Sequence, residues 1–299
     1  MDIGASGEIH PKWKILAPYS ICLAFDADDR EFTVTEQTNT QYKKLILFNR
    51  IVTAAPTASA PFYLTASPFC SSLLPPLAAK LEPWLFSPLF KVEKETILPA
   101  ITLTAALQQS GIRYVDWFKT DSQGTDLRLF RSLPPAALGT VKAAELEPGI
   151  IDAYEGEDKL YTILQEMPAA GFWLSAMVVK GTQRLHHKYQ AQWGSFASER
   201  IIRRSPCWTE LTWLREATFT TERDALLLLV FALLEKQWGF ALEVIDKAGA
   251  LSENPVFAES RKAVERQLNF EKRILPLTIL RKKISKLLAP LHAKFLYII

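Results

Sequence analysis

YVDWFKTDSQGTDL, Tyr114–Leu127, is the stretch that decides the fold. Its first five residues form an extended apolar run, and Lys119, Asp121 and Gln123 follow at the end of that run. A glycine then leads into a helix-like segment, Thr125–Leu133. A buried strand that ends in polar residues and turns through a glycine into a helix presents chemistry at the carboxyl edge of an open α/β sheet. The stretch therefore predicts a strand, a functional turn and a helix.

Similar strand and helix patterns continue on both sides of this stretch. Alternating strands and helices favour an α/β fold with a Rossmann-like, doubly wound and mostly parallel sheet. The first strand should be central and buried, although only Met1, Asp2 and Ile3 precede the first glycine and central strands commonly run longer. The other expected strands lie in Ser20–Phe25, Lys44–Thr53 (after a helix end), Pro61–Thr65, Val92–Leu103, Val141–Ile151 and Phe172–Lys180, and expected helices in Thr104–Ser110 and Leu160–Met167.

The opening residues Met1–Gly7, MDIGASG, predict a strand end that runs into a glycine turn. Gly4 and Gly7 let the main chain approach a ligand closely. A second apolar strand ends in Asp26, which lies 22 residues after Gly4. A carboxylate at that place is where ribose-bearing cofactors are held by their hydroxyls. We therefore predict that Asp26 binds a ribose, whereas Asp28 is expected to be a solvated loop acid.

The glycine spacing distinguishes between cofactors. A dinucleotide site normally has three glycines, because its pyrophosphate lies on the helix N-terminus. Only two glycines, three residues apart, occur in the opening turn. S-adenosylmethionine has no phosphate, and a looser turn preceded by an acid, here Asp2, suits its amino and sulfonium charges. The turn therefore favours S-adenosylmethionine over a nicotinamide cofactor.

Lys119–Leu127 resembles the K-x-D-x-Q-G-x-E-L signature of the FkbM family of S-adenosylmethionine-dependent methyltransferases, with Asp126 in place of the usual Glu. MDIGASG is similar to the family's V-D-I-G-A-s-G-g opening, with Glu8 in place of the second glycine, and Tyr154–Asp158 resembles its Y-x-G-q loop. The resemblance spans roughly residues 1–180. It implies a class I methyltransferase fold and O-methylation of a sugar, glycan or natural-product hydroxyl. Together with the strand-tip argument for Asp26, it gives the predicted cofactor-binding residues Asp2, Gly4, Ala5, Ser6, Gly7 and Asp26.

The polar residues after the central strand carry the predicted catalysis. Odd-numbered positions of a strand share one face, so Lys119 and Asp121 should be close enough to pair. Our hypothesis is that Asp121 contacts the acceptor hydroxyl or accepts its proton, that Lys119 orients Asp121 and holds it ionised, and that Gln123 completes the site. The alternative is a strand-end ion pair between Lys119 and Asp121, with Gln123 capping the next helix.

A boundary is predicted at residue 180, with a methyltransferase-like domain in 1–180 and a helical extension in 181–299. Helices are expected in Thr221–Glu235, in Trp238–Ala248 and after Asn254. Bases concentrate in Leu185–Arg204, which would suit an acidic or phosphorylated substrate. The basic and apolar tail Arg281–Ile299, which Pro290 should interrupt, suits a peripheral membrane or protein contact, or it covers the domain's own apolar surface.

Composition narrows the class of protein. Lys and Arg number 35 and Asp and Glu 32, a balance of +3 that gives no support for nucleic acid as a partner. The three cysteines are far apart and, like the histidines, have no ligand-like spacing, so we predict free thiols and no metal site. No secretion leader is evident, and the longest apolar run, Ala225–Leu234, is half of what a bilayer span needs. A cytoplasmic protein is expected.

Two alternatives to a methyltransferase remain at this point. The short first strand, Glu8 and Asp126 favour a non-catalytic interaction protein on a degenerate methyltransferase fold. A nicotinamide-dependent enzyme is disfavoured by the missing third glycine. Binding of S-adenosylmethionine separates these readings.

Overall fold

The computed structural model describes residues 1–5, 11–28, 30 and 41–295 of the chain. It divides into two compact units, Met1–Thr218 and Phe219–Ile299. The predicted residues Ser6, Gly7 and Glu8 lie outside the described residues.

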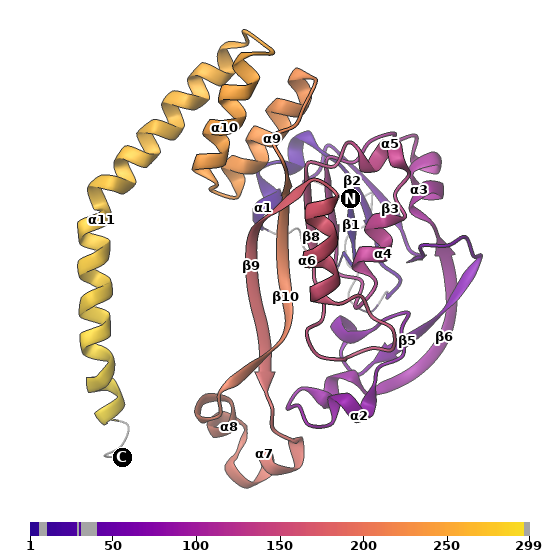
Figure 1. The fold of residues 1–299 in the computed structure, drawn as a ribbon. Helices are drawn as coiled ribbons and strands as arrows, with labels where there is room; N and C mark the ends of the chain where they lie inside the picture. Colours follow the sequence, from indigo (N-terminus) through magenta and orange to yellow (C-terminus); the bar gives the residue numbers. More distant parts are fainter. Residues whose placement is uncertain (6–10, 29, 31–40, 296–299) are drawn as a thin grey trace. The chain divides into compact units, whose positions relative to one another are not determined.

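The first unit is built on a seven-stranded sheet in the order β3-β2-β1-β7-β8-β10-β9 (Figure 1). The first five strands of this order run parallel, and β10 is antiparallel to both of its neighbours. The predicted α/β fold with a mostly parallel sheet, compatible with a Rossmann-like arrangement, is confirmed. The strands are β1 Asp2–Ile3, β2 Ile21–Phe25, β3 Lys44–Phe48, β7 Trp117–Thr120, β8 Ala143–Leu146, β9 Phe172–Gln183 and β10 Arg204–Arg215.

The shortest strand, β1, lies in the middle of the sheet as the sequence predicts. Its Asp2 is the register partner of Ala24 in β2 and of Lys119 in β7. Ile3 is buried, and the terminal amino group of Met1 donates a hydrogen bond of 2.9 Å to Trp117 O. Two residues are enough here because the strands on both sides supply its hydrogen-bonding partners.

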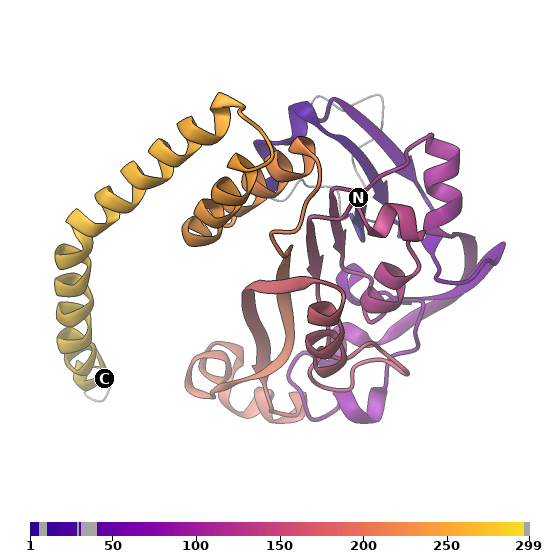
Figure 2. The ribbon, with the colours of Figure 1, turned by 45° about the horizontal axis from the view of Figure 1, so that its top comes forward.

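Helices α3 (Leu103–Ser110), α4 (Asp126–Arg131) and α6 (Leu160–Ala169), with the short α5 (Pro135–Leu138), pack their apolar side chains against one face of the sheet (Figure 2). α3 begins where Thr102 accepts a hydrogen bond from the Ala105 N–H, and it ends at Gly111. On another part of the sheet Lys12, from α1 (Pro11–Lys14), pairs with Glu145 of β8. The strands and helices share one hydrophobic core, which holds the ends of the parallel strands in fixed positions relative to one another.

A second sheet, in the order β4-β6-β5, follows β3 in the chain. It consists of β4 Ile51–Val52, β5 Ser59–Thr65 and β6 Val92–Ile101, and the segment between β5 and β6 contains η2 Pro68–Cys70, α2 Ala78–Leu81 and η3 Ser87–Phe90. The expected helix end at Lys44 is wrong, because Lys44 opens the strand β3. This second sheet and its connecting loops supply one wall of the candidate site.

The predicted boundary at residue 180 falls inside β9, and the first unit continues to Thr218. After β9 come two short helices, α7 His187–Trp193 and α8 Ser195–Ile201, and then β10, which inserts between β8 and β9. The first helices after Thr182 therefore belong to a small insertion between β9 and β10, and the later ones belong to the second unit. Phe172–Lys180 is not the last strand, and the helical extension begins later than predicted.

The second unit consists of α9 Glu222–Leu234, α10 Trp238–Gly249 and α11 Pro255–Phe295. Thr221 caps α9 as predicted, accepting a hydrogen bond from the Asp224 N–H, and Pro255 is the first residue of α11. The prediction that Pro290 interrupts the last helix is wrong, because α11 continues to Phe295. Among the described helices, none combines the length and the apolar character that a membrane span requires.

Candidate functional site

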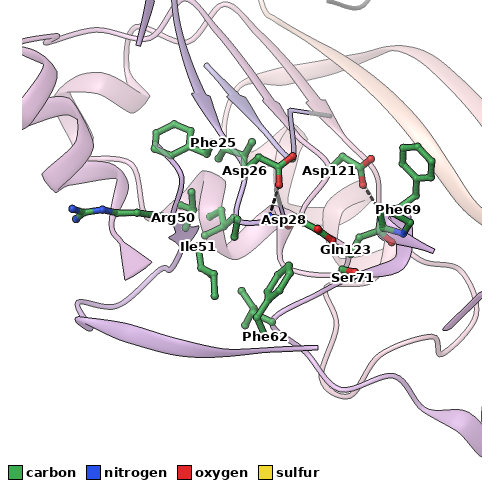
Figure 3. A pocket seen from close by; sticks show the side chains of 18 residues that line it. Phe25, Asp26, Asp28, Arg50, Ile51, Phe62, Phe69, Ser71, Asp121 and Gln123 are labelled. Atoms are coloured by element: carbon green, nitrogen blue, oxygen red, sulfur yellow. Dashed lines mark hydrogen bonds between the residues drawn. The ribbon is translucent and has the colours of Figure 1, made fainter. Parts of the chain in front are cut away.

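Four parallel strands end in residues with ligand-binding potential at the same edge of the large sheet. Gly4 follows β1, Asp26 follows β2, Asp121 follows β7 and Glu147 follows β8. Asp26 and Asp121 follow the ends of β2 and β7, the two strands that flank β1, and Phe62 of the second sheet faces them (Figure 3). The first cavity lies between them, and its described walls include Ile3, Gly4, Phe25, Asp26, Asp28, Ile51, Val52, Phe62, Ser71, Asp121 and Gln123.

Gly4 occupies a place that no other residue fits. Its φ is +76°, and a Cβ atom at this position would lie 2.2 Å from Asp121 O. The N–H groups of Gly4 and Ala5 both donate to Phe25 O, at 2.9 and 3.1 Å. Ala5 packs its side chain against Cys22 and Ala24. The opening turn is thus locked between the tips of β2 and β7.

The Asp26 carboxylate lies on the wall of the first cavity, as the strand-tip prediction requires. Its Oδ1 accepts a hydrogen bond of 2.8 Å from the Asp28 N–H. Burial raises the pKa of Asp26 to about 6, and the negative charge of Asp28 adds to this shift while the hydrogen bond from Asp28 opposes it. Asp26 is therefore a carboxylate whose charge is only partly compensated by the protein.

Asp28 is not the solvated loop acid that the sequence suggested. It is buried, and the Arg30 guanidinium donates to both of its carboxylate oxygens. Burial works to raise the pKa of Asp28, but Arg30 outweighs it and holds the pKa below its ordinary value. Arg30 also donates to Ser71 Oγ and Thr65 O, so the pair ties the β2 loop to the second sheet.

Lys119 pairs with Asp2, where the sequence predicted a pair with Asp121. The Lys119 Nζ lies 2.7 Å from Asp2 Oδ1, because the two residues are register partners on adjacent parallel strands. Burial works to lower the pKa of Lys119, but the charges of Asp2 and Asp121 outweigh it and raise the pKa. Among the described residues that line the two cavities, neither Asp2 nor Lys119 appears.

Asp121 is positioned by Gln123, from the same turn. The Gln123 Nε2 donates a hydrogen bond of 2.5 Å to Asp121 Oδ1 (Figure 3). Gln123 is held in turn by Ser72 Oγ, which donates to its main-chain oxygen at 2.8 Å, and by the Tyr154 hydroxyl, 3.0 Å from its Oε1. Gln123 therefore orients the carboxylate, and the alternative reading as a helix cap is wrong because Thr125 occupies the N-cap position of α4.

A second cavity shares Asp121 and Gln123 with the first. Aromatic and acidic side chains make up much of its described wall, among them Phe86, Phe90, Glu147, Tyr154, Glu157, Trp208 and Glu210. The rings of Phe86 and Trp208 are stacked, with centroids 6.2 Å apart and an interplanar angle of 8°. The two cavities therefore adjoin at Phe69, Asp121 and Gln123, which line both.

Three carboxylates, those of Asp121, Asp126 and Glu147, lie close enough at the junction of the two cavities to affect one another's pKa. Burial raises the pKa of Asp121, although the positive charge of Lys119 works against the shift. Burial and the charges of Asp121 and Asp126 likewise raise the pKa of Glu147. Asp126 is not among the described residues that line either cavity. It stabilises the turn after β7, because its carboxylate accepts hydrogen bonds from Thr120 Oγ1, the Ser122 N–H and the Glu147 N–H.

The sequence analysis missed Glu147, Trp208 and Glu210 as site residues. Glu147 follows β8 at the same edge, so the strand-tip argument that identified Asp26 and Asp121 would have found it too. Trp208 and Glu210 lie on β10, whose alternation of buried Cys207, Thr209, Leu211 and Trp213 is a strand signal. Tyr154 lies in the loop that carries the family resemblance, but its contact with Gln123 depends on tertiary structure.

Protein-family models, curated proteins and solved structures all give no match to this chain.

Proposed function

We propose that the chain is an S-adenosylmethionine-dependent methyltransferase that O-methylates a hydroxyl of a sugar, glycan or natural-product acceptor. The observation that carries the proposal is the meeting of two cavities at Asp121. The first cavity has the turn at Gly4 and the Asp26 carboxylate expected for the donor, and the second offers room for an acceptor. Methyl transfer needs both molecules to be aligned, and adjoining cavities provide that alignment.

The strand order supports the same proposal. In the seven-stranded sheet, the reversed strand β10 is inserted between β8 and β9. A parallel sheet with a reversed strand inserted beside its last strand is typical of class I methyltransferases. This strand order agrees with the resemblance of residues 1–180 to the FkbM family. The position of β10 depends on its pairing with β8 and β9, which lie outside the motifs that carry the resemblance.

The residues of the first cavity fit the donor. Asp26, whose carboxylate at the second strand tip is only partly compensated by the protein, is suited to accept hydrogen bonds from ribose hydroxyls. Ile51, Val52 and Phe62 offer the apolar surface that an adenine ring needs. The tight approach of Gly4 to Asp121 leaves no space for a side chain between the donor turn and the catalytic turn. Asp2 acts indirectly in this scheme, by pairing with Lys119.

Asp121 is the residue that this scheme places next to the acceptor. The bound cofactor supplies an electrophilic methyl group. Asp121 Oδ2 accepts the proton of the acceptor hydroxyl, while Gln123 holds Oδ1. Burial raises the pKa of Asp121 and so makes it a stronger base than an ordinary aspartate. The positive charge of Lys119, which is paired with Asp2, favours the ionised form of Asp121.

The acceptor cavity favours some acceptors over others. Asp121, Glu147, Glu157 and Glu210 lie on its described wall, and Trp208 and Phe86 offer flat apolar faces. A neutral polyol can donate hydrogen bonds to the carboxylates and stack on the rings. An acidic or phosphorylated acceptor, suggested by the bases of residues 185–204, would meet like charges here.

Calorimetric titration with S-adenosylmethionine tests the proposal. The wild-type chain should bind with a micromolar Kd, and Asp26→Ala should weaken binding at least about tenfold, since a charge-assisted hydrogen bond is lost. Asp246→Ala changes an exposed aspartate of the second unit and serves as the matched control. Absence of binding by a folded wild-type chain would support the non-catalytic alternative instead.

A further inference from the structure

The insertion between β9 and β10 exposes an unusual set of apolar side chains. We call residues 184–203, with α7 and α8, the hairpin tip. The exposed fractions are 42% for Tyr189, 56% for Trp193, 68% for Phe196 and 81% for Ile201. Large apolar side chains gathered in so short a segment mark an interaction surface more often than a plain solvent-facing surface.

The hairpin tip stands at the end of a two-stranded arm (Figures 1 and 2). β10 pairs with β8 over Leu211–Leu214 and with the segment after β8 at Cys207–Thr209, whereas it pairs with β9 from Arg204 onward. The arm therefore extends beyond the edge of the parallel strands. This position leaves the tip accessible to a large, flat partner.

The apolar residues are exposed although the tip itself is anchored. The Gln183 Nε2 donates a hydrogen bond of 2.7 Å to Glu199 O, and the Leu85 N–H donates to Gln183 O at 3.0 Å. His186 Nε2 lies 3.0 Å from Glu82 Oε1. These contacts fix one side of the tip to the segment around α2. The exposed side chains thus belong to a surface with a defined conformation.

Positive charge lies directly beside these apolar groups. The Arg200 guanidinium stacks on the Phe196 ring at 3.8 Å, and Lys188 Nζ lies 5.0 Å from the centre of the Tyr189 ring. Over residues 184–204 the sequence has a single acid, Glu199. The exposed bases are Arg184, Lys188, Arg200, Arg203 and Arg204. The surface is therefore both aromatic and basic.

We propose that the hairpin tip docks on an anionic lipid bilayer. Trp193, Phe196 and Ile201 enter the interface between headgroups and acyl chains, where tryptophan and other apolar groups are favoured. The bases contact the anionic headgroups. A single-stranded nucleic acid would also engage bases and aromatic rings, but it offers no apolar environment for Ile201, the most exposed of the four apolar side chains.

Vesicle flotation of the full-length chain tests this proposal. The chain should bind vesicles of phosphatidylcholine mixed with phosphatidylglycerol and should not bind pure phosphatidylcholine. Replacing both Trp193 and Phe196 by Ala should weaken binding at least about tenfold, because two buried aromatic contacts are lost. Arg200→Gln with Arg203→Gln should weaken it about 25-fold, since each base near the surface contributes about fivefold.

The matched control is Tyr161→Ala, which removes an aromatic side chain that is 73% exposed on α6. It should bind vesicles as the wild type does. Thermal melting and binding of S-adenosylmethionine should be unchanged in all these variants, which keeps this proposal separate from the methyltransferase proposal.

Three results would overturn the proposal. The first is that the wild-type chain fails to float with anionic vesicles. The second is that the hairpin-tip variants float as well as the wild type, which would assign the binding to another surface. The third is that the wild-type chain binds polyuridylate RNA but not vesicles, and that the hairpin-tip variants lose the RNA binding. The charge variants keep the test decisive even if the double alanine variant fails to fold.

Discussion

Gln123 Nε2 donates a hydrogen bond of 2.5 Å to Asp121 Oδ1 across the turn that joins β7 to α4. Gln123 adopts a φ of +54°, which is uncommon for a residue other than glycine. Ser72 and Tyr154, from two distant segments, hold its main chain and its side-chain oxygen. Strained backbone that is fixed from several sides is typical of functional sites. The arrangement orients the Asp121 carboxylate at the junction of the two cavities.

Tyr154→Phe should remove one of the contacts that hold Gln123 and leave the contact with Ser72 in place. The hydroxyl lies within hydrogen-bonding distance of Gln123 Oε1 and, at 2.9 Å, of Cys70 O, and the contact with Cys70 O is buried. We expect the free energy of unfolding to fall by about 1–2 kcal/mol. Donor binding should not change, because Tyr154 lines only the second cavity. Urea denaturation and calorimetry check the two expectations, with Tyr161→Phe as control, and a tenfold loss of donor affinity would argue against separate donor and acceptor cavities.

Gly4→Ala should be far more damaging than its backbone angle alone explains. Gly156 has a similar positive φ of +65° but nothing within 4 Å of an added Cβ, so Gly156→Ala isolates the backbone strain, about 1 kcal/mol. At Gly4 the added Cβ would also collide with Asp121 O. We expect a loss of about 3 kcal/mol or more and no donor binding. Equal urea midpoints for the two variants would contradict the close approach of the two turns.

The ion pair between Asp2 and Lys119 should show strong coupling. Both side chains are largely buried, at 15% and 17% exposure, so removing one partner leaves the other charged and unpaired. Asp2→Asn and Lys119→Met should each destabilise the chain by about 3 kcal/mol, and the double variant by clearly less than their sum. A double-mutant cycle in urea measures the coupling. Additive effects would show that Lys119 draws its stability from another partner.

Asp26 should make donor binding and stability depend on pH in opposite ways. Its pKa is raised from 3.8 to about 6, so the carboxylate form that accepts ribose hydrogen bonds is lost as the pH falls below about 6. Affinity for S-adenosylmethionine should then decline up to about tenfold per pH unit, and Asp26→Asn should bind weakly with a flat profile. A wild-type affinity that stays constant between pH 7 and pH 5 would be inconsistent with this role.

The same shift predicts the stability of Asp26→Asn. A carboxyl whose native pKa is raised costs stability as the pH rises from its unfolded value of 3.8 through about 6, because the native state disfavours the charged form. The neutral variant avoids this cost. It should be more stable than the wild type by up to about 3 kcal/mol above pH 6, and the gain should vanish near pH 4. Denaturation at both pH values checks the sign.

Local patterns predicted the parts of the fold and site that depend on short stretches of sequence. Strand tips followed by Gly4, Asp26 and Asp121 were identified because an apolar run that stops at a polar residue or a glycine marks the carboxyl edge of a sheet. The Lys119 partner was predicted wrongly, since spacing along one strand says nothing about register with the next. Asp2 is the closer carboxylate only because β1 and β7 are neighbours.

Other features depended on contacts between distant segments. β10 follows an insertion with helices, and its place between β8 and β9 is set by long-range pairing. The wall of the second cavity combines Phe86, Tyr154 and Trp208, which lie far apart in the chain. Asp28 was predicted to be a solvated acid because the contacts that hold its partner Arg30 come from the distant residues Thr65 and Ser71. No periodicity in the sequence carries this information.

A crystal structure of the chain with S-adenosylhomocysteine, the product of the donor, tests the central claim most directly. The account predicts the ligand in the first cavity, with its ribose hydroxyls hydrogen-bonded to the Asp26 carboxylate and its sulfur on the side of Asp121. A ligand bound at a place not lined by Gly4, Asp26 and Asp121, or no ligand at saturating concentration, would contradict it.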